Sequence, residues 1–349
     1  MKTIAYACLL AAALLIGCRS EEVQISAQEA LKTVAVADLS MSDLYDTRGI
    51  LKVGNSFVAL ASDGEFNAVS INLQSGEQRP FFPCRLSDDD YMFSLMSFNS
   101  TDGRTVTALD YQNGRLIETT LSGEESRSIA PAEEHVISLP AGQQHLIAAK
   151  GSSFVIATGL YNKGRYLYYD LNDQTARYFL DYPGHEDYPD MLTRTKAVLY
   201  ASNILRIRPD ESAFVCADMY SGLIDFCRIV SSSVERVRMV RLRHPIVDIE
   251  EKPGINVAYY RSNPLGFADV AVSQERVYAL YSGRSVEEYG NDASMGDILL
   301  VYDWEGNLLQ SYQLDIPLLN IAYDSEKNAV YGLSVSDENK LTRLNFSAL

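Results

Sequence analysis

The feature that most constrains this chain is a strand pattern that recurs about every fifty residues. Each repeat has a polar turn followed by a short run of β-branched and aromatic residues that opens on Phe or Val. The six opening residues are Phe57, Val106, Phe154, Phe214, Val277 and Val330, at intervals of 49, 48, 60, 63 and 53 residues. A strand-rich repeat of this length is typical of a β-propeller, with one blade per repeat. The sequence therefore predicts an all-β fold, a six-bladed β-propeller.

The last repeat predicts how the ring closes. Blade five contains four strand-like runs, whereas blade six has three before the sequence reaches Leu349. An additional strand-like segment, Thr33–Ala37, precedes the first strand of blade one. Pairing this segment with the last blade would remove exposed sheet edges, which otherwise promote aggregation. We therefore predict that the N-terminal strand supplies the fourth strand of blade six.

The first seventeen residues have the features of a secretory signal. Lys2 gives a positive start, and the apolar run that follows it is too short to span a membrane. The sequence Leu15-Ile16-Gly17-Cys18 resembles the bacterial lipobox. That resemblance implies cleavage before Cys18 and a diacylglycerol on its sulfur, with acyl chains such as palmitate anchoring the protein to a membrane. The alternative is an ordinary signal peptide that ends beside a cysteine by chance.

Charge and composition divide the chain and limit its partners. We expect a signal peptide over 1–17, an acylated cysteine and polar tether over 18–30, and the propeller over 31–349. Glu21 and Glu22 resemble the acidic surface-export signal of Bacteroidetes lipoproteins, which leaves both the cell surface and the periplasmic side of the outer membrane open. The formal net charge is −16, and phosphate backbones would repel such a chain. This charge argues against nucleic acid as a partner.

Three cysteines remain once Cys8 is removed with the signal and Cys18 carries lipid. They are Cys84, Cys216 and Cys227, an odd number that implies no disulfide framework. If Ser221-Gly222 is a two-residue hairpin turn, Cys216 and Cys227 face each other across neighbouring strands. An exported protein meets an oxidising compartment, where a disulfide between them can form. The alternative is that both are small buried apolar side chains.

These features together resemble a known family. The lipobox, the six strand openers and the segment Phe267–Arg284 are similar to the TolB-like six-bladed β-propeller lipoproteins of Bacteroidetes. The most specific part is Tyr278-Ala-Leu-Tyr-Ser-Gly-Arg284. The resemblance covers nearly the whole mature chain and implies the propeller fold and an envelope location. It implies no ligand, reaction or functional residue, and not the partners of TolB itself.

One candidate binding loop lies between blades three and four. The segment Asp181–Asp190 combines two Tyr-Pro pairs, a histidine and four acids within ten residues. Long loops on a rigid scaffold often carry function. In one interpretation Tyr182 and Tyr188 form stacking surfaces and His185 a polar contact for a ligand. In the other, the segment is an ordered surface loop fixed by its prolines.

Of two further candidate loops, one connects blades four and five and the other joins the second and third strands of blade five. One contains Tyr260 and Arg261, and the other contains Arg284 and Tyr289. Aromatic rings beside a guanidinium suit carbohydrate or peptide ligands, and Arg284 could grip a carboxylate or sugar hydroxyls. The structural alternative for Arg284 is an ion pair with Asp269.

The sequence contains no local catalytic motif of the common hydrolase, metalloprotease or nucleotide-binding kinds. We therefore expect no catalytic residues, no metal and no cofactor. The leading hypothesis is a lipid-anchored, non-enzymatic binding module that presents a loop-built propeller face to a peptide, protein or glycan. The alternative is a metal-assisted hydrolase or lactonase at the mouth of the channel, and a third reading is a structural subunit of an envelope complex.

Overall fold

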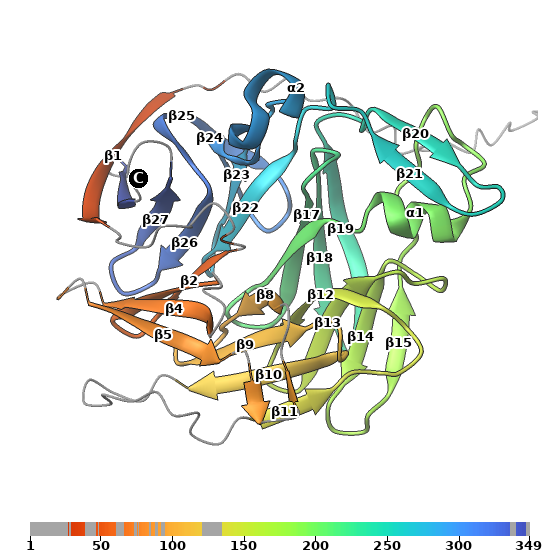
Figure 1. Ribbon diagram of the computed structural model, residues 1–349, viewed down its shortest axis with the longest axis horizontal. Coiled ribbons are helices and arrows are strands. Elements are labelled where there is room, and N and C mark those ends of the chain that lie inside the picture. The colour runs from red at the N-terminus through yellow and green to blue at the C-terminus, as the bar shows by residue number, and fades with distance from the viewer. Residues whose placement is uncertain are drawn as a thin grey trace, which may run out of the picture.

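The structure, a computed structural model, is a ring of six small β-sheets arranged in chain order around a common centre (Figure 1). The described residues are 27, 29–38, 47, 49–60, 66–72, 75, 77–83, 85–87, 90–91, 95–120, 135–335 and 340–346. The predicted signal peptide, Cys18 and Cys84 lie outside this part of the chain.

Each blade of the ring has four strands, here called A to D from the ring centre outward. Blade one consists of β2 (Ile50–Val53), β3 (Ser56–Ala59), β4 (Phe66–Asn72) and β5 (Gln78–Pro83). Blade two consists of β8 (Leu95–Asn99), β9 (Thr105–Asp110), β10 (Arg115–Thr120) and β11 (His135–Ser138). Blade three consists of β12 (His145–Lys150), β13 (Phe154–Gly159), β14 (Tyr166–Asp170) and β15 (Ala176–Phe179). Blade four consists of β16 (Asn203–Ile207), β17 (Ala213–Asp218), β18 (Leu223–Val230) and β19 (Ser233–Arg241). Blade five consists of β22 (Phe267–Val272), β23 (Val277–Tyr281), β24 (Gly296–Tyr302) and β25 (Leu308–Leu318). Blade six consists of β26 (Asn320–Asp324), β27 (Ala329–Ser334), β28 (Lys340–Asn345) and β1 (Glu29–Asp38).

Short elements decorate the connections between these strands. They are two two-stranded ribbons, β6 (Arg85–Ser87) with β7 (Asp90–Tyr91) and β20 (Val247–Glu250) with β21 (Asn256–Tyr259), and the helices α1 (Thr193–Leu199), α2 (Val286–Tyr289) and η1 (Gly290–Ser294). Because consecutive strands in a blade are antiparallel, the A–B and C–D turns lie at one end of the ring. The B–C loops and the D–A connections lie at the other end, which we call the loop end.

The hydrophobic core lies between the blades. Among the described residues, six apolar clusters each combine side chains from two neighbouring blades, including blades six and one. At that last junction the rings of Phe57 and Tyr331 lie 5.0 Å apart. Every residue of β13, β17, β23 and β27, the B strands of blades three to six, is buried. Burial on both faces explains why these strands are continuous apolar runs and do not alternate with polar residues.

The predicted closure of the ring is confirmed. β1 pairs antiparallel with β28, with Thr33 opposite Leu344 and Val34 opposite Arg343, and its first residues also pair in parallel with β25. Leu31 is 3% exposed and packs in the cluster between blades five and six, whereas Val34 is 45% exposed. β1 begins at Glu29, two residues before the expected start of the ring. The first described strand therefore joins the last two blades into one eight-stranded sheet.

Candidate functional site

The connection between blades four and five and the B–C loop of blade five meet at the loop end, as the blade topology requires. Backbone hydrogen bonds connect them, from the Gly283 N–H to the Leu265 carbonyl (3.0 Å) and from the Leu265 N–H to the Arg284 carbonyl (2.7 Å). A third bond runs from the Glu287 N–H to the Arg261 carbonyl (2.9 Å). The blade-five B–C loop and the connection between blades four and five therefore form one laced surface.

Four of the predicted ligand-binding residues lie on this laced surface, and we call them the loop rim: Tyr260, Arg261, Arg284 and Tyr289. Tyr260 and Tyr289 are 53% and 48% exposed, and Arg261 is also exposed. The Arg284 guanidinium carbon lies 5.1 Å from the centre of the Tyr289 ring, a cation–π distance. The rim thus offers two half-exposed aromatic faces and two guanidinium groups on backbone that is already ordered.

The expected pairing of Arg284 with Asp269 is wrong. Arg284 instead donates to Asp297 at the start of β24, with 2.5 Å between Nη2 and Oδ2. Asp269 lies deeper, near the ring axis, where Arg206 of the neighbouring blade donates to it (3.0 Å). Asp297 is the second residue of β24, directly after the B–C loop that carries Arg284, whereas Asp269 lies inside the A strand β22 opposite Leu280.

Tyr182, His185 and Tyr188 are turned toward the protein, which contradicts their expected role as an exposed lip. Tyr182 and His185 are 7% and 3% exposed. The Tyr182 hydroxyl donates to the Gly159 carbonyl (3.0 Å), and His185 Nε2 donates to the Pro245 carbonyl (3.0 Å).

The reason for this burial is a small substructure outside the blades, formed by helix α1 and the β20–β21 ribbon. Helix α1 and the β20–β21 ribbon pack together over an apolar cluster that includes Tyr182, with Tyr188 packed partly buried against it. The carboxylate of Glu251 holds the two parts together by accepting from the Leu192 N–H (2.9 Å) and the Thr195 hydroxyl (2.5 Å). The loop after blade three is therefore an ordered, pinned segment, as in the structural interpretation.

Cys216 and Cys227 are free, buried thiols, and the geometry expected for a disulfide between them is wrong. Cys216 lies opposite Asp225 and Cys227 lies opposite Phe214. The turn between β17 and β18 is longer than two residues, and this shifts the register by two. Burial raises the pKa of Cys216 to about 11 and raises that of Cys227 as well.

A buried ion-pair network fixes blade three to blade four beside these thiols. Asp225 is fully buried and accepts from the Tyr166 hydroxyl (2.8 Å) and from Arg165 (3.3 Å). Arg236 donates to both oxygens of the same carboxylate, at 2.8 and 2.9 Å. A charge buried this deeply needs such partners, so the network has a structural role.

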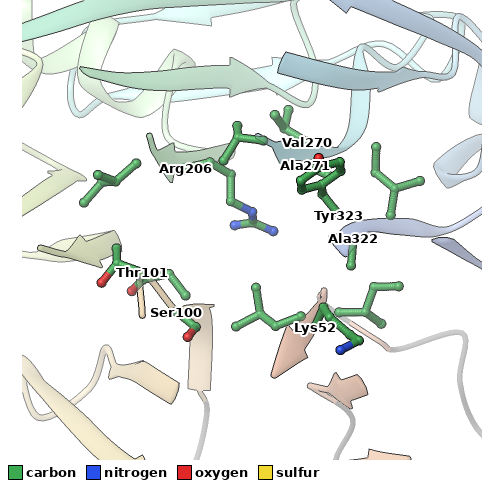
Figure 2. Close-up of a pocket in the computed structure, with 14 residues that line it drawn as sticks. Lys52, Ser100, Thr101, Arg206, Val270, Ala271, Ala322 and Tyr323 are labelled. Atoms are coloured by element: carbon green, nitrogen blue, oxygen red, sulfur yellow. The ribbon is translucent and has the colours of Figure 1, made fainter. Parts of the chain in front are cut away.

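A small pocket, which we call the axial pocket, lies on the ring axis, away from the loop rim. This pocket has a volume of about 90 Å³ and is lined by residues of five of the six A strands and of the turn after β8 (Figure 2). Of the fourteen lining residues, the two that carry a charge are Lys52 and Arg206. The figure places them on opposite walls, with the Arg206 guanidinium directed to the open centre.

Lys52 and Arg206 are not among the predicted site residues, although the sequence carries a signal for them. Each is the one charged residue of a short apolar A strand, in Ile50–Val53 and in Asn203–Ile207. A charged side chain within an innermost strand of a propeller must point to the axis or be paired between blades. Such a pattern can therefore be read as a candidate axial residue.

The described residues contain no group of three or more His, Cys, Asp or Glu positioned to hold a metal ion. The metal-assisted alternative therefore gains no residue set here. None of the described helices is long and apolar enough to cross a membrane.

A closed ring of six four-stranded blades with loops gathered at one end defines the class of six-bladed β-propellers. Residues 94–326, about two thirds of the chain, match the family described as TolB-like 6-blade propeller-like. The chain belongs to this family, as its sequence features predicted. A comparison with curated proteins gave no match.

Solved structures with the same fold include two from Bacteroides. A member of the DUF4221 family from Bacteroides vulgatus has 8% sequence identity and a TM-score of 0.55, covering 91% of this chain and 99% of that one. A candidate exported protein from Bacteroides fragilis has 11% identity and a TM-score of 0.50, covering 94% and 98%. Virginiamycin B lyase from Staphylococcus aureus has 12% identity and a TM-score of 0.47, covering 90% and 99%. At these identities the likeness to the two Bacteroides structures shows the fold alone.

Proposed function

We propose that this protein is a lipid-anchored binding module of the cell envelope that holds a peptide, protein or glycan at its loop rim. The observation that carries the proposal is the pair of half-exposed tyrosines, Tyr260 and Tyr289, beside two arginines on laced backbone. Tyrosine and arginine are the residues that most often dominate binding energy at protein surfaces. Their combination favours binding over chemistry.

The rim is also preorganised for binding. Arg284 is held by Asp297 on one side and by the Tyr289 ring on the other, and Tyr289 belongs to the short helix α2. Side chains that are ordered before a ligand arrives lose less conformational entropy on association. Arg284 would thus position Tyr289, while Tyr260, Arg261 and Tyr289 supply the contact surface.

Membrane attachment is the second part of the proposal. The lipobox-like ending at Cys18 supports acylation there, and acyl chains can hold a folded domain at a membrane without a spanning helix. The likeness to a candidate exported protein agrees with export of this chain.

The binding test uses single variants of the rim. We expect Tyr260→Ala, Arg261→Ala and Tyr289→Ala each to weaken retention of the ligand captured from envelope extracts or a glycan array by at least tenfold, a typical hot-spot loss. Arg104→Ala is the matched control, because Arg104 is exposed in an A–B turn at the opposite end. Binding that survives all three rim changes would place the ligand elsewhere.

The attachment test is independent of the ligand. Cys18→Ala should move the protein from the membrane fraction to the soluble fraction, while Cys84→Ser should leave its distribution unchanged. Retention of the Cys18 variant in the membrane fraction would reject acylation at that residue.

A further inference from the structure

The charges that line the axial pocket are unusual for this protein. The chain has a formal net charge of −16, yet the two charged side chains in the pocket wall, Lys52 and Arg206, are both cationic. Both are largely buried, with side chains 8% and 11% exposed. Keeping cations in a low-dielectric site is unfavourable unless negative charge lies close by.

Two carboxylates do lie near these cations, but behind the pocket wall. Asp269 pairs with Arg206 and also accepts from the backbone N–H groups of Val270 (2.8 Å) and Ile321 (3.0 Å). Asp324 lies 3.8 Å from Lys52, and its other oxygen accepts from two backbone N–H groups of the following turn. Neither aspartate lines the pocket. The carboxylates therefore position the cations from behind, and the charged side chains that line the pocket are both cationic.

The two cations keep unused hydrogen-bond donors. A guanidinium has five N–H donors, and Arg206 uses two in its described contacts, one to Asp269 and one to the Leu205 carbonyl (3.2 Å). An ammonium has three donors, and Lys52 directs one to the Gly54 carbonyl. Figure 2 shows Ser100 and Thr101 along another wall, so further polar groups face the same space.

The dimensions of the pocket limit what can enter it. One water needs roughly 10–15 Å³ of cavity volume. A pocket of about 90 Å³ can therefore hold several waters or one small oxyanion. Tyr323 lines this pocket and also lines a larger groove, about 560 Å³, between the A–B turns of blades five and six. That groove includes Tyr278, whose ring stacks on Tyr323 at 5.7 Å, and Arg276. A molecule larger than an oxyanion could rest there with its charged end in the pocket.

We propose that the axial pocket is an anion-binding site in which Arg206 and Lys52 hold a small oxyanion, a carboxylate or a phosphate, either free or as the end group of a larger molecule. Charge-assisted hydrogen bonds to carboxylate and phosphate are among the strongest in proteins. The site lies toward the A–B end of the ring, so it is distinct from the loop rim.

The experiment is calorimetric titration of the folded protein with inorganic phosphate and with acetate, in chloride buffer of matched ionic strength. We expect saturable binding of at least one of them with a stoichiometry of one. Lys52→Gln and Arg206→Gln should each weaken it at least tenfold. Lys327→Gln and Arg104→Gln are the matched controls, because both side chains are exposed in A–B turns at the same end. They should leave binding unchanged.

A second variant guards against misfolding. Arg206→Gln leaves Asp269 without its ion pair, so circular dichroism must confirm the fold, and Arg206→Lys keeps the charge if the glutamine variant unfolds. Arg206→Lys should retain part of the affinity, whereas Lys52→Gln tests the opposite wall independently. The proposal is overturned if the wild-type protein binds neither anion beyond the chloride background. It is also overturned if Lys52→Gln and both Arg206 variants bind the anion as tightly as the wild type. The rim variant Tyr260→Ala should not affect anion binding, so the two proposals can fail separately.

Discussion

Truncation of Leu31 tests whether the N-terminal strand holds the ring together. Leu31 is 3% exposed and packs against residues of blades five and six, so Leu31→Ala removes a core contact from the closing strand. Buried Leu→Ala changes lower the free energy of unfolding by about 3 kcal/mol, the lower part of the measured range. An unfolding entropy of about 2.1 cal/mol/K per residue gives about 0.6 kcal/mol/K for a ring of roughly 300 residues, so Tm should fall by about 5 °C.

The matched control is Val34→Ala in the same strand. Val34 is 45% exposed, and surface substitutions usually change stability by less than about 0.5 kcal/mol. Its Tm should therefore shift by no more than about 1 °C by the same conversion. Thermal unfolding followed by circular dichroism measures both variants, and size-exclusion chromatography reports any opened or associated ring. Equal shifts for the two variants would refute a closing role for the buried face of β1.

Two further predictions concern groups buried in blade four. Burial raises the pKa of Asp218 above its ordinary value of 3.8, so folding favours its protonated form. A carboxyl group with a raised pKa adds stability to the fold below its unfolded pKa, and this contribution is lost as pH rises through its folded pKa. Asp218→Asn keeps an acceptor for the N–H groups of Tyr220 and Ser221, so urea midpoints should show it more stable than wild type at pH 7, with the gain vanishing toward pH 4; a gain that grows as pH falls would contradict this sign. In a chain that carries Cys18→Ala and Cys84→Ser, Cys216 and Cys227 should resist thiol reagents at pH 8 until the protein is unfolded, because burial raises both pKa values. Intact mass should not change on reduction, and a gain of two hydrogens would instead reveal a disulfide.

The ring and its closure could be predicted from the sequence because both depend on local patterns. Apolar runs such as Phe154–Gly159 and the polar turns before them recur with each blade, and blade six visibly lacks a strand. The outer strands of blade two, β10 and β11, are less apolar and were not apparent. Blade edges face solvent on one side, so their sequences carry a weaker strand signal.

The candidate site could be predicted only in part, because side-chain partners depend on contacts far apart in the chain. His185 is buried against Pro245, sixty residues later, after α1 and the β20–β21 ribbon have packed together. Arg206 reaches Asp269 across sixty-three residues and two blades. Spacing within one loop does not encode such pairings. The exposure of Tyr260 and Tyr289 was easier to anticipate, since both lie in connections that topology places at one end.

Blade six combines residues 29–38 with residues 340–346, so the first part of the ring to be synthesised waits for the last. During synthesis, five blades can assemble before the apolar side chains of Leu31 and Leu344 can pack in one cluster. Such long-range pairing slows folding and prolongs the exposure of unpaired, aggregation-prone strand edges. The ring therefore cannot close until its last strand has been synthesised, and until then its unpaired edges are open to chaperones.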